Sequence, residues 1–113
     1  MITCEEVEAL AMALPAAHKV RLWDRLDVYK VTSKVFASCD EADGLVFKAS
    51  EILYALLADD GPGRPAPGFV PGAWVAVPLS EVEPAEAADW IARSHGYAVA
   101  GLTRAVRREL GLA

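Results

Sequence analysis

The chain has 113 residues, of which 54% are hydrophobic and 24% are charged, and its net charge is -5. This length is typical of one domain, and this balance of apolar and charged residues excludes general disorder. No uninterrupted apolar run approaches the roughly 18 residues that span a bilayer. We therefore expect one domain, residues 1–113, with no membrane association.

The first six residues and the cysteine content favour a cytoplasmic location. The N-terminus contains Glu5 and Glu6, whereas a secretory signal begins with basic residues. Cys4 and Cys39 are too few for a disulfide framework, so we expect reduced thiols. Cys39 is expected to pack as a small hydrophobic residue within a strand.

Charge is unevenly distributed along the chain. Residues 49–92 contain seven acids and one basic residue, Arg64. Residues 93–113 contain four arginines and one acid, Glu109. An anionic partner is therefore expected to contact residues 26–48 or the C-terminal end, and not the acidic middle of the chain.

A helix is expected at the N-terminus. Thr3 and Glu6 have the spacing of a capping box, in which each side chain binds a free amide of the first turn. The residue before a proline avoids helical geometry, so Pro15 ends the helix. Apolar residues repeat at helical spacing between these limits, at Val7, Leu10, Ala11 and Leu14.

Residues 26–48 have the strongest β character in the chain. Three runs rich in Val, Phe and Tyr are separated at Thr32-Ser33 and at residues 40–44. β-branched and aromatic residues suit strands, and the polar breaks suit tight turns, so a three-stranded antiparallel meander is predicted. The preceding residues, 18–23, alternate in polarity and form either a short first strand or an extended lead-in.

Strand residues alternate between the two faces of a sheet. In the second strand of the meander, alternation places Val35, Ala37 and Cys39 opposite Phe36 and Ser38. One face of the sheet is expected to be more apolar than the other and to be covered by helices.

A short helix, a loop and a further strand follow the meander. Ser50 is the expected N-cap of a helix over residues 51–58. Residues 59–72 contain four glycines and four prolines, which predicts an exposed loop. Residues 73–79 return to β character, and Pro78 belongs at the end of that strand or at a sheet edge.

The C-terminal part of the chain is expected to be helical. Pro84 suits the first position of a third helix, which Gly96 and Gly101 weaken. Thr103 is expected to cap a separate last helix, closed by Gly111. The complete pattern predicts an α+β fold with an antiparallel sheet of about four to six strands flanked by helices.

The order of these segments resembles the MmcQ/YjbR family over about residues 6–110. The resemblance rests on short motifs in a fixed order: Leu14-Pro15, Tyr29-Lys30-Val31, Lys34-Val35-Phe36-Ala37, Gly44-Leu45-Val46-Phe47-Lys48, Trp74-Val75-Ala76-Val77 and Ser94. It implies a CyaY-like α/β sandwich and a small, non-catalytic DNA-binding protein with a "double wing" arrangement. DNA is thus one expected partner.

Two groups of basic residues are candidates for phosphate contacts of weak or sequence-tolerant type. They are Lys30, Lys34 and Lys48 on the meander, and Arg104, Arg107 and Arg108 on the last helix. The alternative for the lysines is a solvated sheet face that guards an edge against aggregation. The alternative for the arginines is complementation of the helix dipole at a C-terminus.

Aromatic residues offer a different interpretation. Trp74 and Phe69 border the proline- and glycine-rich loop and are candidates for a surface that binds a protein or a small ligand. Trp90 lies on the apolar stripe of the third helix and is expected in the core. This alternative makes the protein a binding module, with a protein as the other expected partner. The sequence leaves the oligomeric state open.

Catalysis is not expected from the sequence. Ser94 and His95 are adjacent, with Asp89 five and six residues earlier, and adjacent helical residues do not face each other. The four Cys and His residues lack the spacing of a zinc site. We therefore expect a protein that is not an enzyme, with no cofactor and no metal.

Overall fold

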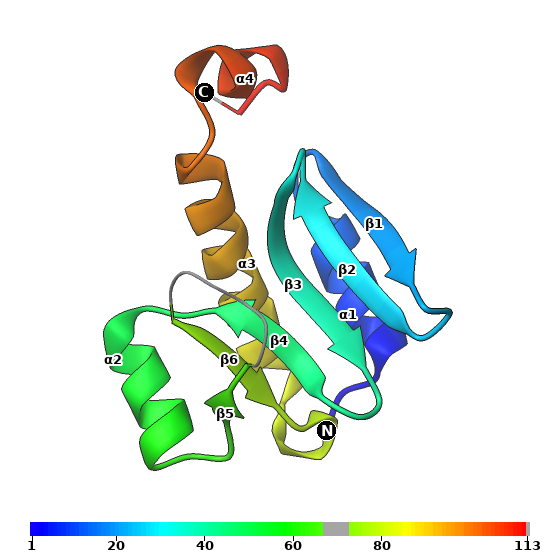
Figure 1. Cartoon of the computed structure of the whole chain (residues 1–113), viewed down its shortest axis with the longest axis vertical. Helices are drawn as coiled ribbons and strands as arrows, with labels where there is room; N and C mark the ends of the chain where they lie inside the picture. The colour runs from blue at the N-terminus through cyan, green and yellow to red at the C-terminus, as the bar shows by residue number, and fades with distance from the viewer. Residues whose placement is uncertain (67–72, 113) are drawn as a thin grey trace.

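A computed structural model describes residues 1–66 and 73–112. Its centre is an antiparallel sheet of six strands in the order β1-β2-β3-β4-β6-β5 (Figure 1). The strands are β1 (Ala17–Leu22), β2 (Leu26–Val31), β3 (Lys34–Asp40), β4 (Gly44–Lys48), β5 (Arg64–Pro65) and β6 (Trp74–Val77). The α+β fold and the number of strands expected from the sequence are confirmed.

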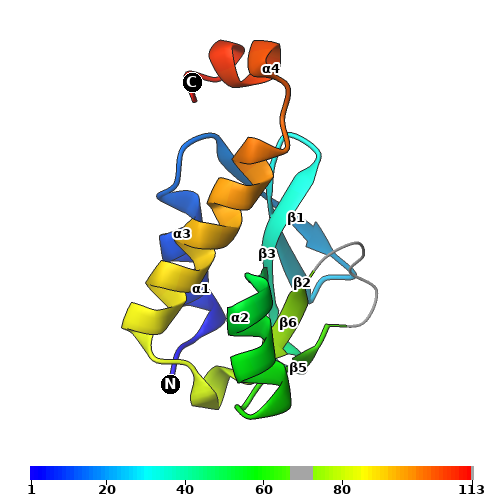
Figure 2. The same ribbon diagram turned by 90° about the vertical axis from the view of Figure 1, so that its left-hand side faces the viewer.

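Four α-helices accompany the sheet, at α1 (Cys4–Met12), α2 (Glu51–Tyr54), α3 (Pro84–Ala100) and α4 (Arg104–Glu109). Helices α1 and α3 lie side by side over one face of the sheet (Figure 2). A π-helical turn, Ala55–Asp59, extends α2 to the end of the predicted helix, and a 3-10 turn, Leu79–Glu81, precedes α3. In the described residues, no helix is both long and apolar enough to cross a membrane.

The predicted helix starts are confirmed. The Oγ1 of Thr3 accepts a hydrogen bond from the amide of Glu6, and the Glu6 carboxylate accepts one from the amide of Thr3. Ser50 caps α2 by accepting from the Leu53 amide, and Pro84 occupies the first turn of α3. Local side-chain chemistry therefore sets these boundaries.

The three-stranded meander is confirmed as β2, β3 and β4, and residues 17–22 form a true strand, β1. The predicted faces of β3 are wrong at two residues, Val35 and Phe36. A bulge opposite Tyr29 and Lys30 pairs Lys30 with Val35, so Phe36 joins Ala37 on the helix-covered face. A bulge adds one residue to a strand, and strict alternation cannot anticipate it.

The core lies between the sheet and the helices. Trp90 is 7% exposed and stacks on Phe47 with ring centroids 5.1 Å apart, as expected for a core residue. The largest side chains with less than 2% exposure are Tyr29, Phe36, Phe47, Ile2, Leu45 and Ile91. Burial of these aromatic and aliphatic groups supplies the main stabilisation of the fold.

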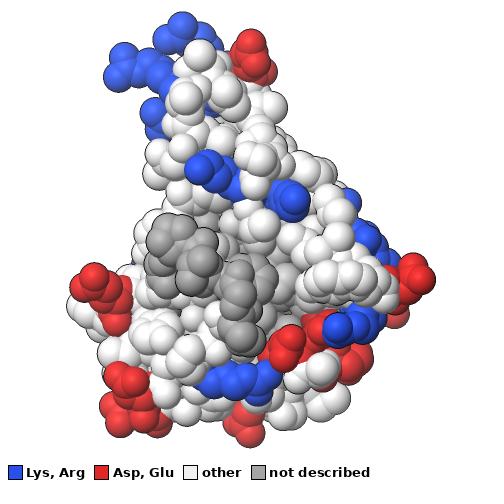
Figure 3. Space-filling view, in the orientation of Figure 1, with Lys and Arg blue, Asp and Glu red and all other residues white. Residues whose placement is uncertain are grey.

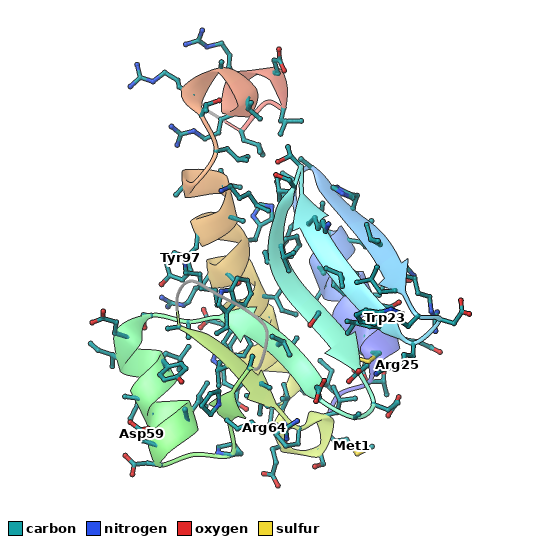
Figure 4. All side chains as sticks on the ribbon, viewed as in Figure 1. Met1, Trp23, Arg25, Asp59, Arg64 and Tyr97 are labelled. Atoms are coloured by element: carbon teal, nitrogen blue, oxygen red, sulfur yellow. A yellow bond between two sulfur atoms is a disulfide. The ribbon has the colours of Figure 1, made fainter. Side chains whose placement is uncertain are left out.

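The expectation of reduced thiols is wrong. Cys4 and Cys39 form a disulfide between the start of α1 and β3, with their Cα atoms 5.8 Å apart (Figure 4). The two cysteines are 35 positions apart in the sequence. The chain between them forms β1 and β2 and then returns, so that β3 passes beneath α1. Cys39 is buried as expected. The cytoplasmic location stays a prediction, and it loses the support of the thiols.

Helix α4 projects from the end of α3 (Figure 1). Gly101 ends α3, and the Oγ1 of Thr103 accepts a hydrogen bond from the Val106 amide, which starts α4 where the sequence predicts it. Gly111 follows with a φ of +73°, as expected for the glycine that closes a helix. α4 has no fully buried side chain, so it presents its polar residues to solvent.

Candidate functional site

The eleven lysines and arginines divide into two sets by their partners. Five of them form ion pairs with carboxylates: Lys19–Glu8, Arg21–Asp27, Arg25–Asp40, Arg64–Asp43 and Arg93–Asp89. The other six form no ion pair among the described residues: Lys30, Lys34, Lys48, Arg104, Arg107 and Arg108. These six are the residues that the sequence assigns to phosphate contacts. Each of the five paired cations has a carboxylate partner nearby, whereas the six retain uncompensated charge for an anionic partner.

Most of the six lie at one end of the molecule. The arginines lie on α4, and Lys34 is the first residue of β3, directly after the β2–β3 turn, which lies at the same end in both views (Figures 1 and 2). Lys and Arg atoms gather at this end, whereas acidic atoms gather lower down (Figure 3). We call Lys30, Lys34, Arg104, Arg107 and Arg108 the basic end.

Lys34 connects the sheet part of the basic end with the helical part. Its Cε would lie 3.7 Å from a Cβ placed on Gly101, the residue that ends α3, three positions before Arg104. A cation there also complements the C-terminal dipole of α3. Lys30 lies further along β2, where it pairs with His18 and Val35, and it is half-buried. Lys34 therefore lies near the start of α4, and Lys30 lies four positions earlier in the chain, before the turn that leads to Lys34.

Lys48 has a different setting. It ends β4, pairs with Trp74 of β6, and lines a groove of about 270 Å³ between α2 and α3. The other five cations do not line this groove. The structure therefore brings five of the predicted residues to one end and leaves Lys48 outside that set.

The groove beside Lys48 exposes apolar side chains. Ile52 is 76% exposed and Leu56 58%, one turn apart along α2 and its π-helical extension. Tyr97 faces them from α3, where Figure 4 shows it at the edge of the helix. The Arg93–Asp89 ion pair forms the polar rim. This apolar groove was not found from the sequence, because α2 is too short for its exposed side to be recognised by periodicity.

Trp74 and Phe69 are only partly placed. Trp74 packs against Val46 and Ala76 in a small cluster separate from the main core. Trp74 is half-buried, and Phe69 lies outside the described residues. The surface that the sequence assigns to this pair stays a prediction.

Ser94 and His95 have separate hydrogen-bond partners. The Ser94 Oγ donates to the Phe36 carbonyl at 2.6 Å and accepts from the Lys48 amide at 2.9 Å. The ring of His95 packs edge-on against Phe36, and its Nε2 lies 2.9 Å from the carbonyl of Pro15. Both side chains contact Phe36, but their hydrogen-bond partners differ, since Ser94 bonds to Phe36 and Lys48, and His95 to Pro15.

Ser94 lies where β3 and β4 separate. The last pair of the two strands is Ala37 with Phe47. One position further, the hydroxyl of Ser94 bonds to the Phe36 carbonyl and the Lys48 amide, in place of a direct hydrogen bond between the strands. Ser94→Ala is expected to lower the free energy of unfolding by about 2 kcal/mol, because two backbone groups lose their partner. Urea denaturation measures this change.

Ser38 provides the matched control for Ser94. Both side chains are 1% exposed, but the Ser38 Oγ has no hydrogen-bond partner in the described structure. Ser38→Ala should therefore leave stability within about 0.5 kcal/mol of the native protein, or raise it. Equal losses for the two variants would show that the Ser94 hydrogen bonds do not contribute to stability.

The opposite end of the sheet has compensated charges. Trp23 is 73% exposed in the β1–β2 turn, and the Arg25 guanidinium lies 5.8 Å from the centre of its ring (Figure 4). Arg25 also donates to the buried carboxylate of Asp40, which accepts from the Asp43 amide as well. The ion pairs at this end are satisfied within the chain, so it offers little free charge to an anion.

Tyr29 is buried beneath α1 with its hydroxyl unpaired. Burial raises the pKa of this phenol well above its usual range, and the carboxylates of Asp27 and Glu8 add to the shift. Hydrogen bonding to Glu8 raises the pKa of Lys19 in the same region. In the described part of the chain, no three His, Cys, Asp or Glu side chains form a group suited to a metal.

One antiparallel sheet covered by helices, with unpaired cations at one end, defines a small α+β protein with a candidate anion-binding end. A family model described as YjbR matches residues 12–96, which is most of the chain. The chain therefore belongs to the YjbR family, and the resemblance to MmcQ/YjbR proteins is confirmed. Among curated proteins, no match was found.

The matched region divides the basic end. The region matched by the family model, residues 12–96, is shorter than the span of residues 6–110 expected from the resemblance. It includes Lys30 and Lys34 but not α4. Arg104, Arg107 and Arg108 thus lie outside the region that defines the family. Their contribution has to be judged from this chain alone.

Proposed function

We propose that this protein binds duplex DNA through phosphate contacts at the basic end, without catalysis and with little sequence preference. The main support is the division of the cations: five of the six that lack an ion pair lie at one end, on two neighbouring parts of the fold. Phosphates require cations and little else, and arginine binds them in bidentate geometry.

The arrangement suits the DNA backbone better than base edges. The arginines of α4 are on a helix of only six residues that projects from the body, and Lys34 is at the end of a strand, beside the β2–β3 turn. Side chains on such projections reach phosphates without entering a groove deeply. Base recognition needs hydrogen-bonding side chains held at fixed positions inside a groove, and a six-residue helix is short for insertion into one. We therefore propose affinity that depends little on sequence.

The overall charge of -5 limits this binding. Acidic side chains gather away from α4 (Figure 3), so repulsion favours one orientation in which the basic end faces the DNA. Binding is expected to be weak at physiological salt, as is typical of non-specific contacts.

A salt titration tests the proposed function. Fluorescence anisotropy with a labelled duplex measures the affinity between roughly 50 and 200 mM salt. Five phosphate contacts predict a slope of log K against log salt of about -4.5, and a loss of affinity of about 500-fold over this range. Undetectable binding at low salt, or an affinity independent of salt, would contradict the proposal.

The groove between α2 and α3 supports a second candidate, a module that binds a protein or a small ligand. Its exposed Ile52 and Leu56 offer apolar contact area that the basic end lacks. Apolar surface with a polar rim is typical of such sites. NMR screening with small apolar ligands tests it: shifts at Ile52 and Tyr97 would support this candidate, and shifts elsewhere would reject it.

A further inference from the structure

The disulfide joins an accessible cysteine to a buried one. Cys39 is 1% exposed and lies in the core, whereas Cys4 is half-buried at the first position of α1. Cys4 lines a cleft of about 890 Å³ between α1 and the strands β1 and β2. Lys19 and Arg21 of β1 line the same cleft, and Cys39 does not. A reagent in the cleft therefore meets Cys4 and not Cys39.

This geometry selects the sulfur that exchanges. A thiolate attacks a disulfide sulfur along the line of the S–S bond, from the side opposite the leaving sulfur. Cys4 lines the cleft, so a thiolate reaches this residue from solvent. Cys39 is 1% exposed and does not line the cleft, so the core closes the approach to it. Attack at Cys4 is thus the open route.

The bond holds the first turn of α1 to the sheet. Val7 and Ala11 are the two fully buried side chains of α1, and Val7 closes the first turn. Before Cys4, Ile2 is buried, and its amide donates to the Leu79 carbonyl. The first turn itself presents Glu5 and Glu6 to solvent. Its own link to the sheet is the bond from Cys4.

The family match does not include Cys4, because it begins at residue 12. The bond therefore links a residue outside the matched region to a strand inside it. The remaining attachments of α1, at Ile2, Val7 and Ala11, do not depend on this bond. The fold is expected to persist when the bond is open.

We propose that Cys4–Cys39 is a reversible thiol–disulfide site, at which a dithiol exchanges with Cys4 and reduction loosens the first turn of α1. The dithiol belongs to the chemical class of vicinal dithiol reductants, either a small molecule or a carrier protein. This site is independent of DNA binding, because α1 is not part of the basic end.

The exchange proceeds in two balanced steps. A thiolate of the dithiol bonds to the Sγ of Cys4, the Cys4–Cys39 bond breaks, and the electron pair leaves on Cys39, which takes up a proton. The second thiol of the dithiol then loses its proton and attacks the first sulfur of the dithiol, which is bonded to Cys4 in the mixed disulfide. This attack releases Cys4 as a thiolate, which is then protonated. The protein gains two electrons and two protons, and the dithiol loses the same number as it closes to a disulfide.

The reverse reaction is also supported by the fold. In the reduced protein, Cys4 lies at the N-terminus of α1, where the free amides and the helix dipole favour an anion such as a thiolate. Nearby carboxylates oppose this effect, and two of them, Glu8 and Asp27, are paired with Lys19 and Arg21. Cys4 is therefore the expected nucleophile when an oxidised reagent restores the bond.

The test uses the full chain with dithiothreitol under native conditions, followed by oxidised glutathione. Thiol titration should find two thiols per chain after reduction and none after reoxidation. Hydrogen exchange followed by mass spectrometry should show amides of the first turn of α1 exchanging about tenfold faster or more after reduction, with the strands unchanged. Reduction only after unfolding, or reduction without faster exchange in α1, would overturn the proposal.

The variant Cys4→Ser is the control. It should match the reduced protein in α1 exchange and should not respond to dithiothreitol. Faster exchange in this variant on adding dithiothreitol would contradict the proposal, because no bond remains to be reduced. If the variant fails to fold, the native protein still decides the question through reduction and reoxidation.

Discussion

Replacing Arg104, Arg107 and Arg108 together by glutamine is expected to weaken duplex DNA binding by about a hundredfold or more at low salt. The same change should reduce the magnitude of the salt slope by about 3, since each lost phosphate contact removes roughly one unit. The fold should be preserved, because α4 has no fully buried residue and the arginines form no ion pair in the described structure. Anisotropy titrations at several salt concentrations measure both effects.

The paired cations supply a control with the same change in net charge. Lys19, Arg64 and Arg93 are bound to Glu8, Asp43 and Asp89 on the surface, and exposed pairs contribute little to stability. Replacing these three by glutamine should leave the salt slope nearly unchanged. Equal loss of affinity in the two triple variants would show that net charge alone drives binding, and that the basic end has no special role.

Gly44→Ala is expected to be the most destabilising single change, with a loss of about 3 kcal/mol or more. Gly44 starts β4 with a φ of +80°, a conformation that side chains rarely adopt. A Cβ there would also meet the carbonyl oxygen of Val77 in β6. The atoms that the Cβ would meet belong to the backbone of Val77 and Pro78, which cannot move aside as a flexible side chain can. The pairing of β4 with β6 would therefore be disrupted.

Gly96→Ala is the matched control for this prediction. Gly96 lies within α3, and a Cβ there meets nothing within 4 Å. Alanine favours the helix over glycine by up to about 1 kcal/mol, so this variant should be more stable than the native protein. Thermal unfolding of both variants compares them directly. If the Gly44→Ala protein is as stable as the native one, the predicted clash between the new Cβ and the Val77 carbonyl does not occur.

The local elements of the fold were predictable, because local chemistry determines them. The capping pairs at Thr3 and Ser50, the turn at Thr32-Ser33 and the start of α3 at Pro84 all follow from residues a few positions apart. The β-branched runs gave the three central strands with correct limits. Such signals need no knowledge of the rest of the chain.

The errors concern contacts between distant segments. The bulge that turns Phe36 inward depends on how β2 and β3 pair, and the alternation of residues within one strand does not reveal that pairing. The bond between Cys4 and Cys39 depends on α1 lying over β3. Counting two cysteines indicated a reducing environment, but the fold brings them together. Cysteine number is thus a weaker guide than cysteine position.

The candidate site was predictable as a set of residues but not as a surface. Sequence alone selected the six basic residues, but it gave no information on the carboxylate partners of the other five cations. Two of those pairs join different helices or strands, namely Lys19 of β1 with Glu8 of α1 and Arg21 of β1 with Asp27 of β2. Only the folded arrangement identifies the unpaired set and separates Lys48 from it.

The central claim is that the five unpaired cations of the basic end form the DNA contact surface. An NMR titration of the uniformly labelled protein with a short duplex tests it most directly, because it locates the contact residue by residue. We expect shift changes at Lys30 and Lys34 and across residues 101–108, and none along β5 or the Trp23 turn. Shifts centred on the α2–α3 groove, or no shifts at low salt, would contradict the claim.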